Sequence, residues 1–407
     1  MIFERIILTK KIQNLILTFQ HKKIYNLIII VGVFCMVFSL LVAQANWSKT
    51  QLWQRFDLID SEFRRGDGYS KLSNENGSLA WGQSYLFESY LDMYETTKNK
   101  KYLEKFVIQA DIVIGNTDKN RNLEDYRGRA VVGWGATKYS PTNLRVIYLV
   151  HTGMITYPLV KFALMVKNDS NLDKFRDQAN AYVQLTEEAL SVFDEDWMFN
   201  ENTGVGYYQF RVREQPVGTV FSEKAEEIFM PLPFNQQLAA ARASLYLCQI
   251  QGNESNFCTK ATALAKHFRN RVRQDSKGFY VWDYWYGEAL DIFARTREDV
   301  SHGGIDVDLA ILAYRNSTVF EETDIDKFKN TYDQISKNGE FSRLVDGTGA
   351  ATSPTFISLW MELSPYDCKP WQDFNSLLKQ DNLPEQGATV MLGIAKLAKY
   401  YDICINE

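Results

Sequence analysis

The sequence has few residues of the types that build metal or cofactor sites: 4 His and 5 Cys among 407 residues. No C-x-x-C pair and no Cys/His spacing typical of a zinc site is present. The serine-hydrolase G-x-S-x-G motif, the H-E-x-x-H motif, the P-loop and the dinucleotide-binding fingerprint are also missing. The sequence therefore gives no support for a serine hydrolase, a zincin or a nucleotide-binding protein, and we expect neither a metal nor a cofactor.

The sequence also lacks a large excess of charge and any internal linker. Its formal net charge is -5, and no basic stripe alternates with aromatic residues, so we expect no nucleic-acid partner. No Pro/Gly/Ser-rich stretch or low-complexity run interrupts the chain after residue 45. We therefore expect residues 46–407 to form one domain.

The N-terminal segment, residues 1–45, has the composition of a cytoplasmic leader followed by a membrane anchor or a signal peptide. A run without charged residues extends over 27–43, and basic residues precede it. This asymmetry predicts that the remainder of the chain crosses the membrane. The pattern Ala43-Gln44-Ala45 permits cleavage, so the body is either anchored or secreted, in the periplasm or the extracellular space.

Four of the five cysteines follow that segment and would lie in an oxidising compartment. Pairing of Cys248 with Cys258 across a helical turn is one expectation, and pairing of Cys368 with Cys404 then follows by elimination.

The body repeats one alternation: a segment that is apolar on nearly every side, then a helix with a single apolar stripe. This contrast indicates an inner helix followed by an outer helix. The predicted inner segments are 79–94, 154–166, 238–250, 305–314, 356–363 and 388–401. Their outer partners are 102–114, 172–190, 257–272, 325–335 and 371–378, with 52–63 completing the last pair beside the C-terminal helix.

Ser353 and Pro354 would begin the fifth inner helix as N-cap and first helical residue. Six such hairpins would close a ring. The pattern resembles the all-α (α/α)6 toroid, the six-hairpin glycosidase-like fold of many carbohydrate-active proteins, without the signature of a named family. The resemblance implies a substrate site at one open end of the inner ring. It also implies that long connections, here 116–149, 194–233 and 274–299, gather at that end.

The strongest catalytic candidate is His302, which begins an inner helix. With Ser301 as N-cap, the helix dipole would lower the pKa of His302 and favour a neutral base. Asp306, one turn further on, would fix its tautomer. The alternative is a pair that satisfies polar groups at a buried helix end, and a metal site including Asp308 and Glu298 is a weaker alternative.

Other inner helices begin with polar or aromatic residues that would meet His302 if the helices run parallel. His151 occupies an equivalent place in the second repeat, although a lone histidine there could also be a satisfied core group. Amide side chains suit sugar hydroxyls, but they are also ordinary helix caps. The candidates for substrate binding at these openings are Trp81, Gln83, Asn235 and Gln236.

The long connections add aromatic and charged candidates. Asp283 could act as an acid beside a stacking platform formed by Tyr284 and Trp285, or the segment could be a rim strand that covers the ring. Arginines could bind a substrate carboxylate in bidentate fashion, which would point to uronic acids, or could brace a loop against Asp125. The remaining candidates are Tyr139 for acid-base chemistry and Arg129, Trp134, Tyr208 and Arg211 for substrate binding.

These observations favour an extracytoplasmic enzyme that acts on a polysaccharide or oligosaccharide, of the uronate lyase or epimerase type and based on His/Tyr acid-base chemistry. A glycoside hydrolase that uses Asp283 and Asp306 is the first alternative, because hydrolysis needs two carboxylates about 5–10 Å apart. A non-catalytic glycan-binding protein of an exopolysaccharide system is the second. A helical ring that serves protein partners fits the polar helix openings less well.

Overall fold

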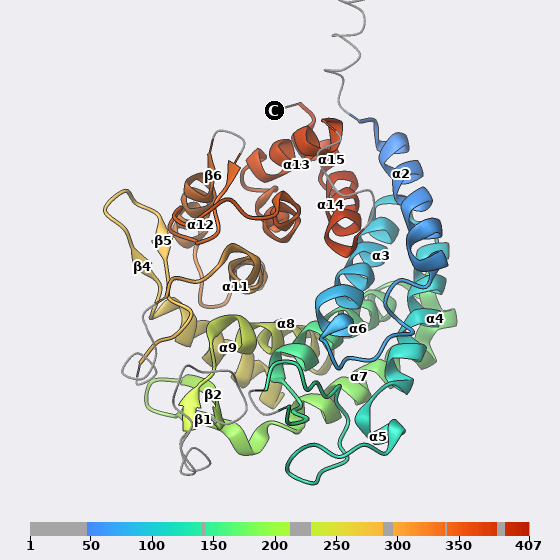
Figure 1. The fold of residues 1–407 in the computed structure, drawn as a ribbon, viewed down its shortest axis with the longest axis vertical. Coiled ribbons are helices and arrows are strands. Elements are labelled where there is room, and N and C mark those ends of the chain that lie inside the picture. The colour runs from blue at the N-terminus through green and yellow to red at the C-terminus, as the bar shows by residue number, and fades with distance from the viewer. Residues whose placement is uncertain are drawn as a thin grey trace, which may run out of the picture. The chain divides into compact units, whose positions relative to one another are not determined.

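The computed structural model describes residues 47–406 apart from 141–142, 212–228, 288–295, 338–339 and 381–386. The predicted membrane or signal segment and Cys35 lie outside these residues. Ser48–Glu407 is one compact unit by its internal contacts. Its helices form two concentric rings, an inner one around the centre of Figure 1 and an outer one around it.

The inner ring consists of the nearly all-apolar segments that the sequence predicts. These are η2 (Leu79–Gln83) continuing into α3 (Ser84–Thr97), α6 (Leu149–Asn168), α8 (Phe234–Gln251), α11 (Val300–Arg315), η7 (Pro354–Leu363) and α14 (Ala388–Lys399). The outer ring consists of the helices with one apolar stripe. These are α4 (Lys101–Gly115), α7 (Arg176–Ser191), α9 (Asn256–Arg269), α12 (Glu322–Ile335), α13 (Lys369–Lys379) and α2 (Lys49–Glu62).

The ring is closed by the two ends of the described chain. Helix α2 packs against α14, and α14 also packs against α3, so the first and last helices are neighbours. An ion pair between Lys49 and Asp402 (2.5 Å) joins the same two regions. The predicted pairing of 52–63 with the C-terminal helix is confirmed.

The fifth inner segment differs from its prediction. η7 is a 3₁₀ segment rather than an α-helix, and Ser353 makes no side-chain cap hydrogen bond. The hydroxyl of Ser353 instead lies 2.9 Å from the hydroxyl of Thr355. Pro354 does occupy the first turn, as expected.

Short strands and helices form the rest of the described chain, mostly in the long connections. One antiparallel sheet has the order β1 (Trp197–Asn200), β2 (Val205–Arg211) and β3 (Phe229–Pro231). Two-stranded sheets pair β4 (Arg273–Gln274) with β5 (Tyr280–Val281) and β6 (Ser336–Lys337) with β7 (Glu340–Phe341). The short helical segments are η1 (Phe63–Gly66), α5 (Asp118–Arg121), η3 (Ser170–Phe175), η4 (Asp194–Asp196) and α15 (Tyr401–Cys404).

Both predicted disulfides, Cys248–Cys258 and Cys368–Cys404, are present. Disulfides persist in oxidising compartments, so the pair indicates a protein that works outside the cytoplasm. In the described part of the chain, α6 is long and apolar enough to cross a membrane, but 89% of its most apolar stretch is buried within the fold. Helix α6 is therefore a core helix of the ring.

Candidate functional site

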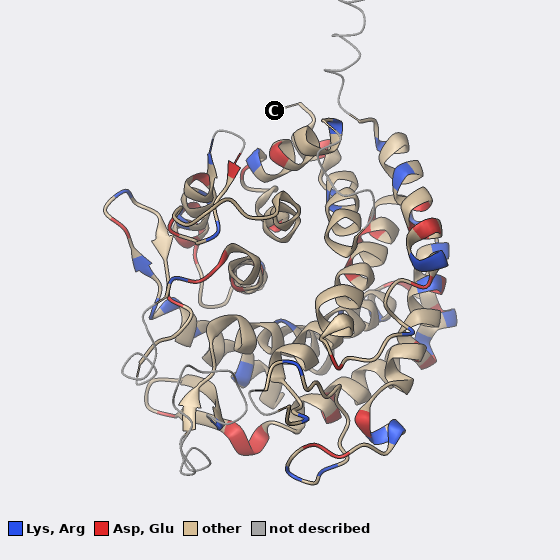
Figure 2. Cartoon of the chain, in the orientation of Figure 1, with Lys and Arg blue, Asp and Glu red and all other residues tan. Residues whose placement is uncertain are grey.

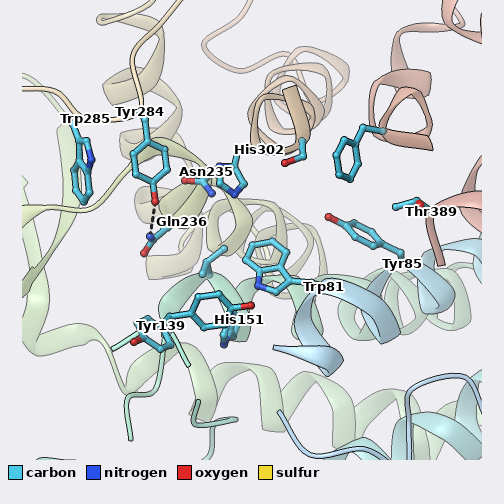
Figure 3. A pocket seen from close by; sticks show the side chains of 14 residues that line it. Trp81, Tyr85, Tyr139, His151, Asn235, Gln236, Tyr284, Trp285, His302 and Thr389 are labelled. Atoms are coloured by element: carbon cyan, nitrogen blue, oxygen red, sulfur yellow. Dashed lines mark hydrogen bonds between the residues drawn. The ribbon is translucent and has the colours of Figure 1, made fainter. Parts of the chain in front are cut away.

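The N-terminal ends of all the inner segments converge on one cavity of about 480 Å³ (Figure 3), which we call the mouth. Each inner segment contributes a residue from its first turn. Two connections, 116–148 and 275–299, supply the remaining walls. The lining residues are Trp81, Tyr85, Tyr139, Tyr148, Val150, His151, Asn235, Gln236, Tyr284, Trp285, Ser301, His302, Phe356 and Thr389. The inner helices therefore run parallel, as the polar openings predicted.

His302 is held from behind by two carboxylates. Its Nδ1 lies 2.8 Å from Oδ2 of Asp299 and 3.2 Å from Oε1 of Glu298, while the imidazole points into the mouth (Figure 3). Burial by itself would lower the pKa of His302, but these two carboxylates raise it to about 10. At neutral pH the side chain is an imidazolium, which can donate a proton but cannot accept one.

This arrangement corrects the predicted environment of His302. The N-cap of α11 is Asp299, whose carboxylate accepts from the backbone N–H groups of Ser301 and His302, rather than Ser301. The helix dipole was expected to lower the pKa, but full charges at hydrogen-bond distance outweigh the partial charge of a helix end. Asp306 does not contact the imidazole: it is fully buried and accepts from the indole N–H of Trp282 (2.8 Å).

His151 has the opposite electrostatic character. It is 2% exposed, and its ring contacts the rings of Trp81, Tyr139 and Tyr148. Burial lowers its pKa to about 3, so the imidazole is neutral. The side-chain amide of Asn74 lies 3.1 Å from Nδ1 of His151, and its Oδ1 accepts from the backbone of Ala80. Because an amide nitrogen can only donate, the ring proton of His151 lies on Nε2.

Aromatic rings surround the two histidines. Tyr284 stacks on His302 with ring centres 5.7 Å apart, and the ring of Trp81 lies 6.2 Å from the same imidazole. Gly77 has a φ of +75°, and a side chain there would collide with Trp81 and with the hydroxyl of Tyr139. The loop before η2 therefore needs glycine at this position to bring two lining aromatics together.

Two amides complete the wall opposite Trp81. Gln236 donates to the hydroxyl of Tyr284 (3.3 Å). Asn235 is 2% exposed, and its Oδ1 accepts no hydrogen bond from the part of the chain that the structure describes. A ligand hydroxyl or N–H group would satisfy this buried oxygen.

Several sequence-predicted site residues lie outside the mouth and serve structural contacts. Gln83 is buried and bonds to Gln109, and the buried indole of Trp134 donates to the backbone of Val113. Tyr208, on β2, is buried and its ring contacts that of Trp197 on β1. Arg129 pairs with Asp125, as the bracing alternative predicted, and Arg211 lies over the ring of Phe229. These positions could not be told from mouth positions by residue type.

Asp283 and Asp306, the two carboxylates proposed for hydrolysis, also lie outside the mouth. Asp283 is 3% exposed and forms ion pairs with Arg273 (2.8 Å) and Arg297 (2.5 Å). Asp308, considered as a metal ligand, pairs with Arg242 (2.6 Å). Glu298, Asp299 and His302 offer ligand atoms within 4.8 Å of one another. Nδ1 of His302 lies close to an oxygen of each carboxylate, so the three side chains form an ion-pair cluster.

Sequence reasoning missed several mouth residues. Phe356 and Thr389 stand in the first turns of the last two inner segments, so the rule applied to the first four would have found them. Behind the mouth, Asp299 could have been proposed as the N-cap of α11 in place of Ser301, because aspartate is as common at that position as serine. Asn74 carries no sequence signal of its own, because its role depends on the histidine that the fold brings to it.

No protein-family model matches the sequence, and no curated protein matches it. Solved structures share its fold. The GH76A α-1,6-mannanase from Salegentibacter sp. HEL1_6 has a TM-score of 0.52 and 10% identity, over 88% of this chain and 100% of the mannanase. A variant of that mannanase, inactive after two consecutive aspartates were changed to asparagine, was solved with α-1,6-mannotriose.

The Lin0763 protein from Listeria innocua has a TM-score of 0.50 and 13% identity, over 88% of this chain and 98% of that protein. At such low identities the likeness shows the fold alone. The described chain is an (α/α)6 toroid, the fold of the six-hairpin glycosidases.

Proposed function

We propose that this protein is a carbohydrate-active enzyme that binds an acidic sugar in the mouth and uses His302 as a general acid. The observation that carries the proposal is the imidazolium of His302, fixed by Asp299 and Glu298 and directed into a cavity with aromatic and amide walls. The reaction class that fits best is β-elimination or epimerisation at a uronate.

The walls suit a sugar. A cavity of about 480 Å³ is within the usual size range of small-ligand sites. Flat rings such as Trp81 and Trp285 can stack on the C–H faces of a pyranose, while Asn235 and Gln236 can bond to its hydroxyls.

The electrostatics favour an anionic group on that sugar. Among the described residues that line the mouth, none is an aspartate or a glutamate, whereas His302 is cationic. The inner helices add the positive ends of their dipoles, because each begins at this cavity. A substrate carboxylate near His302 would be partly neutralised, which lowers the pKa of the adjacent C–H group. The candidate acceptor of that proton is the phenolate of Tyr139 in the same wall, after its own proton has passed to solvent, while His302 donates a proton to the leaving oxygen.

Hydrolysis of a neutral glycan is the second candidate. Glu298 and Asp299 are consecutive carboxylic residues behind His302, and the mannanase of similar fold is inactivated by changes at two consecutive aspartates. Both carboxylates contact His302, however, so a hydrolytic role would require substrate to displace the imidazole.

The test incubates the purified full chain with a panel of uronate-containing and neutral polysaccharides. New reducing ends and near-ultraviolet absorbance of conjugated double bonds are followed together. Both signals support elimination, and reducing ends alone support hydrolysis. Exchange of a C–H proton with deuterated solvent, without cleavage, supports epimerisation. If none of these signals appears and the chain binds a glycan tightly, the enzyme hypothesis is overturned in favour of a glycan-binding protein.

The variant His302→Asn tests the general-acid role of His302. We expect turnover to fall about 10²–10⁴-fold, the usual contribution of a general acid. Affinity for an acidic glycan should fall as well, because the variant removes the cation of the mouth, whereas affinity for a neutral glycan should stay within a few-fold of wild type. His267→Asn is the matched control, because His267 is a buried histidine outside the mouth. Thermal unfolding of both variants verifies that they are folded. Equal turnover in His302→Asn and wild type would contradict the assigned role.

A further inference from the structure

Two consecutive glutamines in the first turn of α8 each contact a tyrosine hydroxyl of the connection 275–299. Nε2 of Gln236 donates to the hydroxyl of Tyr284 (3.3 Å), and Nε2 of Gln237 donates to the hydroxyl of Tyr286. In both pairs the amide therefore occupies a lone pair of the hydroxyl oxygen. The two pairs differ in the partner of the hydroxyl proton.

The pair of Gln237 and Tyr286 is complete within the core. The hydroxyl of Tyr286 donates to the carbonyl of Leu232 (2.7 Å), and Oε1 of Gln237 accepts from the backbone N–H of Tyr208 (2.8 Å). Tyr286 is 7% exposed, and its ring stacks on Phe234 with ring centres 4.3 Å apart. This tyrosine serves the packing of the connection on α8 and has no proton to offer a ligand.

The hydroxyl of Tyr284 keeps its proton available. Tyr284 lines the mouth, where its hydroxyl ends beside Gln236 (Figure 3). Among the described residues none accepts a hydrogen bond from this hydroxyl. Burial and the charge of Glu298 raise the pKa of Tyr284, so the hydroxyl stays protonated at neutral pH. The side chain is therefore a hydrogen-bond donor for a ligand in the mouth.

The same tyrosine lies against the cation of the mouth. Its ring stacks on the imidazole of His302, with ring centres 5.7 Å apart and an angle of 26° between the planes. Its backbone N–H donates to the carbonyl of Thr296 (3.0 Å), which fixes the connection at this point. An oxygen that accepts from the hydroxyl lies next to the imidazolium. That position favours a carboxylate, because a full positive charge attracts an anionic oxygen more strongly than a neutral one.

We propose that Tyr284 recognises the carboxylate of the acidic sugar by donating its hydroxyl proton to it, and that Gln236 is the positioning residue that directs this proton toward the mouth. The inference rests on the proposed function and assigns the choice of an acidic over a neutral sugar to one hydroxyl group. Because Tyr284 binds the carboxylate, the proton of His302 stays available for the leaving oxygen.

The experiment measures the affinity of the purified full chain for sugars that differ only at C6. The probes are the methyl glycosides of glucuronate and glucose, galacturonate and galactose, and mannuronate and mannose, titrated by ligand-observed NMR. We expect wild type to bind at least one acid more tightly than its neutral partner. Tyr284→Phe keeps the ring on His302 and removes only the hydroxyl. It should weaken binding of that acid about tenfold, as is typical of a hydrogen bond to a charged group, and binding of the neutral partner at most about twofold.

Failure of this proposal and failure of the proposed function give different results. If wild type shows no preference for any acid, the acidic substrate of the proposed function is wrong and this inference is overturned with it. If wild type prefers an acid and Tyr284→Phe retains the whole preference, the assignment to Tyr284 alone is overturned. Neither result depends on turnover.

The matched control is Tyr286→Phe. It removes the other tyrosine hydroxyl that a glutamine of α8 contacts, in the same connection but outside the mouth. We expect it to lower the temperature of thermal unfolding, because the carbonyl of Leu232 loses its donor, and to leave both sugar affinities at the wild-type values. Equal loss of acid binding in the two phenylalanine variants would show a general disturbance of the connection and would overturn the proposal.

Gln236→Met tests the positioning role. Methionine has a similar length and no donor, so the hydroxyl of Tyr284 would no longer be held with its proton toward the mouth. We expect the preference for the acid over its neutral partner to fall about threefold, within the range of a neutral hydrogen bond. If the hydroxyl instead donates to the amide oxygen of Gln236, loss of that amide would release the proton. The preference for the acid would then rise, and the proposal would be overturned.

If Tyr284→Phe does not fold, the wild-type chain with ¹³C-labelled tyrosine decides the question. The Cζ resonance of Tyr284 should shift when the preferred acid is added to saturation, because its hydroxyl gains an acceptor. The neutral partner should shift it less, and the Cζ resonance of Tyr286 should not respond to either sugar. An unchanged Tyr284 resonance in the presence of bound acid would refute the assignment.

Discussion

The two ends of the inner ring differ in the kind of polar side chains that they place inside the fold. At the mouth, the first turns of the inner helices leave a cavity lined by aromatic, amide and histidine side chains. About two to four turns further along the same helices, charged side chains form a largely buried set of ion pairs that we call the base. The set contains Glu88, Asp92, Lys161, Arg242, Asp308, Arg315, Glu362, Lys396 and Lys399.

The base joins neighbouring inner segments by ion pairs. Asp92 on α3 accepts from Lys161 on α6 and from Lys399 on α14, both at 2.9 Å. Glu362 on η7 pairs with Lys396 on α14 (2.5 Å) and with Arg315 on α11 (2.9 Å). Between α6 and α8 contact is direct instead, because a side chain at Gly153 would collide with the backbone of Ala240.

The comparison shows why charge can be buried at one end and reactive at the other. At the base, Asp92, Asp308 and Glu362 each pair with a basic side chain on an adjacent helix, so these charges are not available to a ligand. At the mouth only the rear of His302 is paired, and the side of the ring that faces the cavity remains free to act. In Figure 2 most charged residues lie on the outer helices and connections, which makes these few inner charges distinctive.

The largest effect that would test this contrast is expected at the base. Asp92→Asn leaves the lysines around it, Lys161 and Lys399, without their main buried counter-charge. We expect the free energy of unfolding to fall by about 3–5 kcal/mol, as is typical when a buried ion pair loses one partner. Urea unfolding measures the loss. Glu104→Gln, which breaks the exposed pair with Lys174, is the control and should cost at most about 1 kcal/mol. Equal losses in the two variants would remove the distinction between base and surface.

The next prediction sharpens the contrast between the two mouth histidines through the pH dependence of stability. His151 has a folded-state pKa of about 3, below its unfolded value near 6.5, so its contribution is present above pH 6.5 and is lost as the pH falls toward 3. His302 has a folded-state pKa of about 10, so its contribution is present below pH 6.5 and is lost as the pH rises toward 10.

We therefore expect His151→Asn to flatten the acid side of the stability curve and His302→Asn the alkaline side. In each window the folding equilibrium constant of wild type should change up to tenfold more per pH unit than that of the variant. Chemical unfolding between pH 4 and pH 9 measures both slopes. Flattening on the same side in both variants would contradict the opposite charge states assigned here.

The smallest effect concerns the disulfides, which both lie at the ends of inner segments that face away from the mouth. Cys248–Cys258 links the end of α8 to α9 with a sequence separation of 10, and Cys368–Cys404 spans 36 residues beyond η7 and α14. The longer loop loses more entropy when closed, so replacing Cys368 and Cys404 by serine should cost about 1 kcal/mol more than replacing the other pair. Thermal unfolding compares the two double variants. A larger loss from the shorter loop would show that native-state contacts outweigh chain entropy.

Periodicity predicted the ring because burial differs between its two layers. An inner helix contacts neighbours on every side and an outer helix on one, so the residues around Tyr90 are buried on all sides of α3, while the buried residues around Phe106 form a single stripe. The same logic placed His151, Asn235 and His302 at one opening, since parallel inner helices must begin at the same end. It failed for residues in the connections, such as Arg129 and Asp283, because a loop has no period that fixes where its side chains point.

The sequence by itself determined the hairpins, their order in the ring, the disulfide partners and the polar first turns that meet at the mouth. Only the tertiary structure decided the chemistry of those turns. A pKa depends on charges within a few ångströms and on exclusion from water, and both come from residues distant in sequence or hidden by the fold. His151 and His302 have equivalent positions in their repeats, yet one is neutral beside Asn74 and the other is cationic beside Asp299 and Glu298.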